Sequence, residues 1–89
     1  MGAREQYYTS LPLGERLKYL RETLELKQSD IAQILHVDRS TYSYYETGKT
    51  EPSLASMVLL SRFYKISLDL MLRGLPEVEA SAAGQNHSS

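Results

Sequence analysis

Short stretches of apolar residues at helical spacing limit most strongly what this chain can fold into. Charged residues separate four leucines in the pattern of an amphipathic helix with one buried face: Leu13, Leu17, Leu20 and Leu24. Similar patterns predict four more helices, over residues 28–35, 38–46, 53–63 and 67–72. Because no segment alternates apolar and polar residues as a strand does, we predict an all-α fold.

Residues suited to helix boundaries separate these segments. Pro12 fits the first turn of the leucine helix. The side-chain oxygens of Asp38, Ser53 and Ser67 are suited to accept hydrogen bonds from the free amides that begin the next helices. Gly48 is placed to end the third helix in the left-handed conformation. The boundaries therefore support the helices that the apolar spacing predicts.

The 89 residues fit one small domain. We divide the chain into an N-terminal extension (1–11), a helical domain (12–73) and a flexible polar tail (74–89), since the tail has too few apolar residues to form a core. The absence of cysteine excludes disulfides and thiolate zinc sites. No apolar run approaches the roughly 18 residues that a membrane span needs. We therefore expect a cytoplasmic protein without a signal peptide or membrane helix.

The sequence contains no arrangement of residues that supports catalysis. His36 and His87 each stand without a second histidine or cysteine at metal-ligand spacing. Neither a glycine-rich phosphate loop nor a recognisable nucleophile arrangement is present. We predict no enzyme activity, no metal site and no cofactor. The formal net charge of −1 also disfavours strong non-specific binding to nucleic acid, so any attraction must come from local placement of cations.

The stretch from Gln28 to Lys49 contains two short predicted helices joined by a tight turn. Ala32 is small enough to let the second helix approach closely, and His36 stands in the turn, where a residue that tolerates positive φ is needed. From about residue 13 to 72 the chain resembles the Cro and lambda-repressor type of helix-turn-helix protein, also called the xenobiotic-response-element family. The residues that carry the resemblance are Arg16, Arg21, Gln28, Ile31, Ala32, Tyr45, Glu46, Gly48, Pro52, Ser67, Leu68 and Asp69.

The resemblance implies a compact five-helix, lambda-repressor-like domain whose third helix lies in the major groove of DNA. It places base contacts on that helix: Arg39, Ser40, Thr41, Ser43 and Tyr44. It places phosphate contacts at Gln28, Thr47 and Lys49, and a structural salt bridge between Arg21 and Glu46. We expect Arg39 to discriminate most, because a guanidinium can donate two hydrogen bonds to guanine.

Three positions depart from the family pattern. His36 replaces the usual glycine of the turn, which predicts mild backbone strain. Lys27 replaces a capping Ser or Thr, so another group must cap that helix, and we expect Lys27 to contact a phosphate instead. Tyr42 replaces a β-branched core residue, and its hydroxyl needs a partner or solvent.

The other tyrosines admit two interpretations. We expect Tyr45 in the core and Tyr44 exposed and functional, rather than a shared platform for single-stranded bases, because helical spacing points their rings in different directions. Tyr7, Tyr8 and the leucines of the last helix fit either the core or a dimer surface, and the sequence does not separate these alternatives.

The functional prediction is a bacterial or phage transcriptional regulator, a repressor, that binds double-stranded DNA as a homodimer. Two recognition helices about 34 Å apart would read a two-fold symmetric operator. The alternative is an antitoxin-like or bridging module that uses the same fold to hold a protein partner. The near-neutral charge and the expected exposure of Tyr44 are compatible with that alternative.

Overall fold

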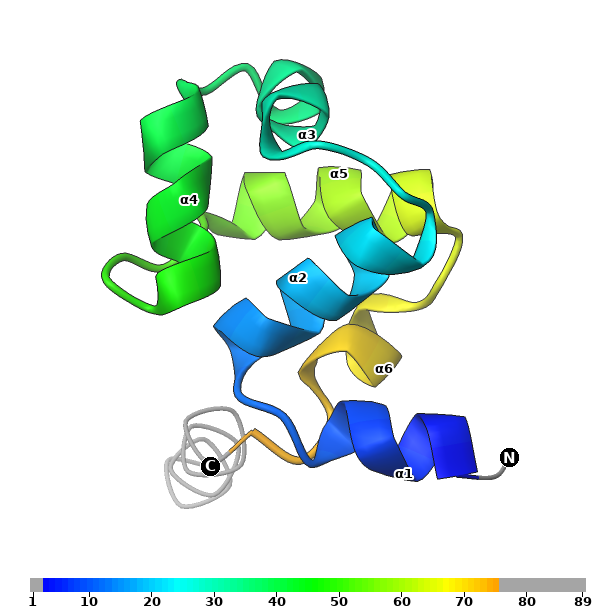
Figure 1. The fold of residues 1–89 in the computed structure, drawn as a ribbon. Helices are drawn as coiled ribbons and strands as arrows, with labels where there is room; N and C mark the ends of the chain where they lie inside the picture. The colour runs from blue at the N-terminus through cyan, green and yellow to red at the C-terminus, as the bar shows by residue number, and fades with distance from the viewer. Residues whose placement is uncertain (1–2, 76–89) are drawn as a thin grey trace.

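The computed structural model describes residues 3–75, which form six α-helices and no strand (Figure 1). Their bounds are α1 Ala3–Thr9, α2 Leu13–Thr23, α3 Gln28–Leu35, α4 Arg39–Thr47, α5 Leu54–Tyr64 and α6 Leu68–Leu72. The predicted all-α class is confirmed for this part of the chain. The predicted number of five helices is too low, because the N-terminal segment contributes α1. Most of the predicted tail, residues 76–89, lies outside the described residues.

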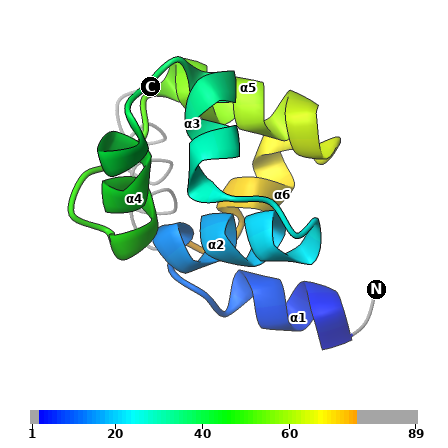
Figure 2. The same ribbon diagram turned by 45° about the horizontal axis from the view of Figure 1, so that its top comes forward.

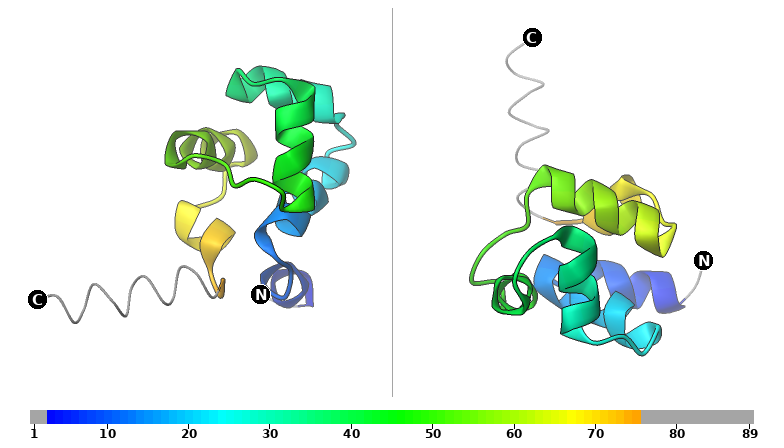
Figure 3. Two further views of the ribbon diagram at one scale, coloured as in Figure 1. Left: turned by 90° about the vertical axis from the view of Figure 1, so that its left-hand side faces the viewer. Right: turned by 90° about the horizontal axis from the view of Figure 1, so that it is seen from above.

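The core is built from the inward faces of α2 to α6, and α2 and α5 cross its middle (Figure 1). Helix α4 packs against both α2 and α3 at the edge of the molecule, so that its outer face is left open (Figure 2 and Figure 3). Six side chains are completely buried: Arg16, Leu17, Ile31, Tyr42, Leu60 and Met71. Five of these are apolar or aromatic, as a core requires, whereas the buried guanidinium of Arg16 needs hydrogen-bond partners.

Two of the three predicted serine and aspartate caps form. The Ser53 hydroxyl accepts a hydrogen bond from the Ser56 amide at 3.1 Å, and the Ser67 hydroxyl accepts one from the Leu70 amide at 3.0 Å. Asp38 occupies the N-cap position of α4, but its side chain accepts no capping bond. That part of the prediction was wrong: Asp38 is at the predicted helix boundary but does not cap the helix with its exposed side chain.

Arg16 holds three separate segments together by hydrogen bonds to backbone carbonyls. Its Nε donates to Leu11 O at 2.7 Å, its Nη1 to Met71 O at 2.9 Å and its Nη2 to Thr9 O at 2.8 Å. The Tyr8 hydroxyl also donates to Met71 O, at 3.3 Å, and the Tyr8 ring lies 5.0 Å from the guanidinium carbon. These five residues, called the Arg16 clamp below, fix α1 to α2 and α6.

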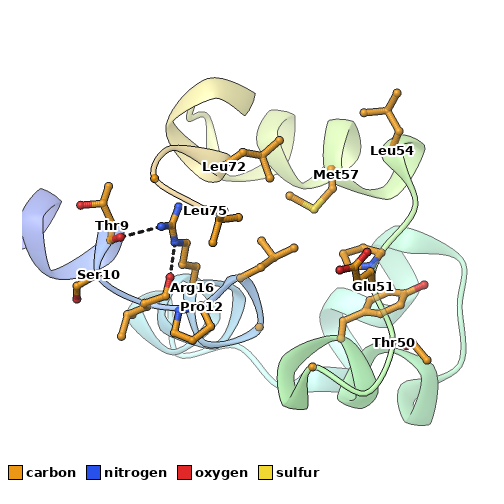
Figure 4. Close-up of a pocket in the computed structure, with 17 residues that line it drawn as sticks. Thr9, Ser10, Pro12, Arg16, Thr50, Glu51, Leu54, Met57, Leu72 and Leu75 are labelled. Carbon is orange, nitrogen blue, oxygen red and sulfur yellow. Dashed lines mark hydrogen bonds between the residues drawn. The ribbon is translucent and has the colours of Figure 1, made fainter. Parts of the chain in front are cut away.

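The environment of the clamp changes the ionisation of both side chains. Burial lowers the pKa of Arg16, because desolvation penalises its charge. Burial raises the pKa of Tyr8 to about 12, although the neighbouring Arg16 opposes that rise. Three residues of the clamp, Thr9, Leu11 and Arg16, line a cavity of about 740 Å³ together with residues that include Met57 and Leu75 (Figure 4). Tyr8 thus belongs to the core, whereas Tyr7 is 55% exposed.

Gly14 permits the close approach of α2 to α4. A Cβ at this position would overlap Glu46 O and would lie 2.7 Å from Tyr45 O. Both contacts are with the backbone, which cannot turn aside as a flexible side chain can. Helix α4 therefore sits as close to α2 as a residue without a side chain allows, an arrangement that the sequence prediction missed.

Candidate nucleic-acid interface

Helices α3 and α4 are joined by the turn that the sequence predicts. His36 adopts the left-handed conformation with φ 59°, and its amide donates to Gln33 O at 3.2 Å. The Val37 amide then donates to Ala32 O at 3.0 Å, which satisfies a carbonyl at the end of α3. Ala32 itself is buried. The substitution of histidine for glycine therefore preserves the geometry of the turn.

Asp30 replaces the missing cap at the start of α3. Its Oδ2 accepts a hydrogen bond from the backbone amide of Lys27 at 2.9 Å, which is half of a capping box. The lysine side chain has no oxygen with which to complete the other half. It is consequently not needed for capping, and the residue that secures this helix start is one that the sequence prediction did not single out.

Helix α4 separates its residues into an anchoring face and an open face. Tyr42 is fully buried, Tyr45 is 9% exposed, and Glu46 is 8% exposed. On the open face Arg39, Ser40 and Tyr44 are exposed. Thr41 and Ser43 are half-buried at the flanks. The predicted base-contact residues therefore share one accessible side of a helix that is anchored on the other.

Arg21 and Glu46 form a nearly buried, two-pronged ion pair between α2 and α4. Arg21 Nε donates to Glu46 Oε2 at 2.6 Å, and Arg21 Nη2 donates to Oε1 at 3.1 Å. Their side chains are 12% and 4% exposed. Arg21 Nη1 also donates to Leu26 O at 2.8 Å, in the connection between α2 and α3. This arginine thus joins α2, α4 and the segment before α3.

Hydrogen bonds continue from this ion pair to the surface. Gln28 Nε2 donates to Glu46 Oε1 at 3.0 Å, and Arg39 Nη1 donates to Gln28 Oε1 at 3.2 Å. We call the series Arg21, Glu46, Gln28 and Arg39 the polar chain. It connects the buried anchor of α4 to the exposed guanidinium at its first residue, so that Arg39 is oriented before it meets a ligand.

The charges of the polar chain are set by their neighbours. Burial alone would raise the pKa of Glu46, but hydrogen bonds from Arg21 and Gln28 outweigh burial and lower it. The hydrogen bond to Glu46 raises the pKa of Arg21. Burial and the nearby Glu46 carboxylate raise the pKa of Tyr42. The Tyr42 hydroxyl was expected to find a partner or solvent, but within residues 3–75 it is buried and has no hydrogen-bond partner.

Residues at the C-terminal end of α4 and just beyond it contact Tyr44. Gly48 ends the helix with φ 83°, as predicted, and the Lys49 amide donates to Tyr44 O at 3.0 Å. Thr47 Oγ1 donates to the same carbonyl at 3.2 Å. Lys49 Nζ lies 4.4 Å from the centre of the Tyr44 ring. Thr47 and Lys49 are exposed at the end of α4 opposite to Arg39.

No group of three or more histidine, cysteine, aspartate or glutamate side chains in residues 3–75 is arranged to hold a metal ion. None of the helices α1 to α6 is long and apolar enough to cross a membrane. The surface around α4 is instead a platform of short polar and cationic side chains. Two short helices packed on each other across a tight left-handed turn, the second with an open polar face, define this class of domain, the helix-turn-helix.

The chain belongs to the helix-turn-helix family, of the Cro and phage-repressor type: the family model described as "Helix-turn-helix" matches residues 17–71. The transcriptional activator BcrR of Enterococcus faecalis is 32% identical over 79 residues, covering 89% of this chain and 38% of that protein. The prophage-derived regulator YonR of Bacillus subtilis (strain 168) is 39% identical over 61 residues, covering 68% of this chain and 56% of that protein.

A solved structure has the same fold. The P22 c2 repressor in complex with a synthetic operator superimposes with a TM-score of 0.65 at 28% identity, covering 72% of this chain and 97% of that one. The lambda-repressor-like fold predicted from the sequence is therefore confirmed. The chain spans less than two thirds of BcrR and YonR, so these relatives contain regions with no counterpart in the alignment.

Proposed function

We propose that this protein is a sequence-specific DNA-binding transcriptional regulator, acting as a repressor in the cytoplasm, that places α4 in the major groove. The observation that carries the proposal is the division of α4 into a buried anchor and an open face with Arg39, Ser40 and Tyr44. The P22 c2 repressor, which carries the same fold, is described in complex with an operator. The protein acts by binding and has no catalytic role.

Base recognition begins with Arg39. A guanidinium at the first turn of a helix in the major groove can donate to both O6 and N7 of guanine. Gln28 holds this guanidinium at 3.2 Å, so less side-chain freedom is lost when it binds. Ser40, Thr41 and Ser43 contribute shorter-range contacts along the same groove.

Phosphate contacts flank the recognition helix on both sides. Lys27 and Gln28 lie at the start of α3, whereas Thr47 is the last residue of α4 and Lys49 lies just beyond it. Contacts with the DNA phosphates fix the register of the protein on the duplex and carry no sequence information. With a net charge of only −1 overall, the protein depends on these local contacts and on a second copy of itself for affinity.

A homodimer follows from the small reach of one recognition helix. Two copies related by a two-fold axis would place their α4 helices about 34 Å apart, one helical turn of DNA. In this proposal the DNA-binding domain comprises residues 12–73, and α1 packs on it as an N-terminal extension held by the Arg16 clamp. The operator should then consist of two half-sites with inverted symmetry.

Selection of bound sequences from a random duplex library tests this function. We expect enrichment of one sequence with two inverted half-sites, and a preference for it over bulk DNA of at least 10³-fold, as specific regulators show. The matched control is the same protein titrated with bulk DNA at the same salt concentration. If no duplex is preferred over bulk DNA at low salt, the proposed function is wrong.

A further inference from the structure

Tyr44 and Lys49 make a contact that base reading does not explain. The Lys49 ammonium lies 4.4 Å from the centre of the Tyr44 ring, within the range of a cation–π interaction. The backbone reinforces it, because the Lys49 amide and the Thr47 hydroxyl both donate to Tyr44 O. We call the pairing of the Tyr44 ring with the Lys49 side chain the clasp.

The clasp restricts the more flexible of its two side chains. A lysine side chain loses rotamer entropy when it is fixed, which weakens the contacts that it makes with a phosphate. A ring that already holds the ammonium removes part of that loss before binding. The ring covers only one side of the ammonium, which has three N–H donors. The ammonium can therefore still donate a hydrogen bond to a phosphate oxygen.

We propose that Tyr44 is a positioning residue, which holds Lys49 toward a DNA phosphate and does not read a base. This inference rests on the proposed function and changes one part of it, since the sequence analysis expected Tyr44 to contact bases. Tyr44 lies in the last turn of α4, which ends at Thr47, and Lys49 follows in the loop that leads to the N-cap of α5 at Ser53. Its ring therefore serves the side of the groove where backbone contacts are made.

A double-mutant cycle separates positioning from base reading. Tyr44→Phe keeps the ring and removes the hydroxyl, Tyr44→Leu removes the ring, and Lys49→Gln removes the cation. Each variant and the Tyr44→Leu/Lys49→Gln pair is titrated with the selected operator and with bulk duplex DNA at several salt concentrations. NMR shifts of the Lys49 ε-methylene, which a ring face moves upfield, report the clasp in the free protein.

We expect Tyr44→Leu to weaken binding to both DNAs by the same factor, roughly two- to fivefold, which is the strength of an exposed cation–π contact. In the Lys49→Gln background the same change should have no further effect. Lys49→Gln should reduce the salt slope by about one. Tyr44→Phe should keep the affinity, the sequence preference and the upfield shift.

Three results would overturn the clasp: an unshifted ε-methylene, an equal effect of Tyr44→Leu with and without Lys49, or a relaxed base preference in Tyr44→Phe. The last would make the hydroxyl a base reader. These outcomes differ from failure of the proposed function, in which the wild-type protein binds bulk DNA without preferring any duplex. The clasp would still be measured in that case, through bulk DNA and the ε-methylene shift.

Discussion

Two arginines of α2, five residues apart, organise two different regions of this molecule. Arg16 is completely buried and donates to the carbonyls of Leu11, Met71 and Thr9. Arg21 is almost as deeply placed, but it pairs with the carboxylate of Glu46 on α4. The first region, the Arg16 clamp, ends inside the domain, whereas the second, the polar chain, leads to the open face of α4.

The difference shows that a buried arginine can have two kinds of role: Arg16 stabilises the domain, whereas Arg21 also supports the face of α4 that we propose binds DNA. The donors of Arg16 are satisfied by backbone carbonyl oxygens, which do not neutralise its charge. The clamp therefore joins chain segments, and its hydrogen bonds do not continue to the surface of α4. The Glu46 carboxylate has lone pairs left after binding Arg21, and it uses them to accept from Gln28, which in turn holds Arg39. Disruption of the clamp should therefore affect stability alone, and disruption of the polar chain should affect both stability and DNA binding.

The largest loss of stability is expected for Arg21→Met. It leaves the buried Glu46 carboxylate without its counter-ion, and breaking a buried pair from one side costs about 3–5 kcal/mol. Urea unfolding at pH 7 measures this loss. Arg62→Met on the exposed surface of α5 is the matched control and should change stability by less than about 0.5 kcal/mol. Equal effects at the two positions would contradict a structural role for the ion pair.

Arg16→Met should cost somewhat less, about 2–4 kcal/mol. The methionine fills much of the space but leaves the carbonyls of Thr9 and Leu11 without a donor, whereas Met71 O keeps the Tyr8 hydroxyl. Urea unfolding and DNA titration of the folded variant measure the two consequences separately. A folded Arg16→Met protein that has lost operator preference would remove the distinction between the two regions.

Gly14→Ala tests the close packing of α4 against α2, the helix that carries both Arg16 and Arg21. We expect a loss of about 1–3 kcal/mol, because the added methyl group meets backbone atoms of Tyr45 and Glu46. The matched control is Gly48→Ala, where a Cβ would meet nothing within 4 Å and only the left-handed φ of 83° is strained. Thermal unfolding compares them, and DNA binding should weaken in Gly14→Ala if α4 is displaced. A Gly14→Ala protein as stable as the wild type would refute the close approach.

The smallest effect is a pH dependence of the polar chain. The folded state lowers the pKa of Glu46 below its ordinary value of 4.5, so its ionised form adds stability above that pH. This contribution is lost as the pH falls through the lowered folded-state pKa. The stability difference between wild type and Glu46→Gln, followed by urea unfolding from pH 7 to pH 3, should shrink below about pH 4.5. A constant difference across that range would argue against a stabilised carboxylate.

The sequence predicted what depends on local chemistry. The apolar spacing located α2 to α6, and the serine caps and the left-handed Gly48 and His36 marked their ends. Helix α1 escaped prediction because seven residues carry no apolar stripe of their own, and its stability depends on Met71, more than 60 positions from Tyr8. The function of Gly14 was missed for the same reason, since only the position of α4 gives it meaning.

In the candidate site, too, the sequence predicted some features and missed those that depend on tertiary packing. Family resemblance paired Arg21 with Glu46 and placed Gln28 and Arg39 at the DNA, and the structure contains the ion pair. It did not reveal that Gln28 links the two, because that link requires the actual side-chain geometry of α3 against α4. Contacts with DNA at these positions remain predictions.

We expect Arg39, held by Gln28 of the polar chain, to read a base in the major groove. The direct test compares wild type, Arg39→Ala and the control Arg62→Ala on the selected operator and on single-base variants of it. Arg39→Ala should lose about 1–3 kcal/mol of discrimination at one base pair per half-site, with thermal stability unchanged. Arg62→Ala should behave as wild type. If Arg39→Ala retains the full preference at every position, Arg39 does not read a base.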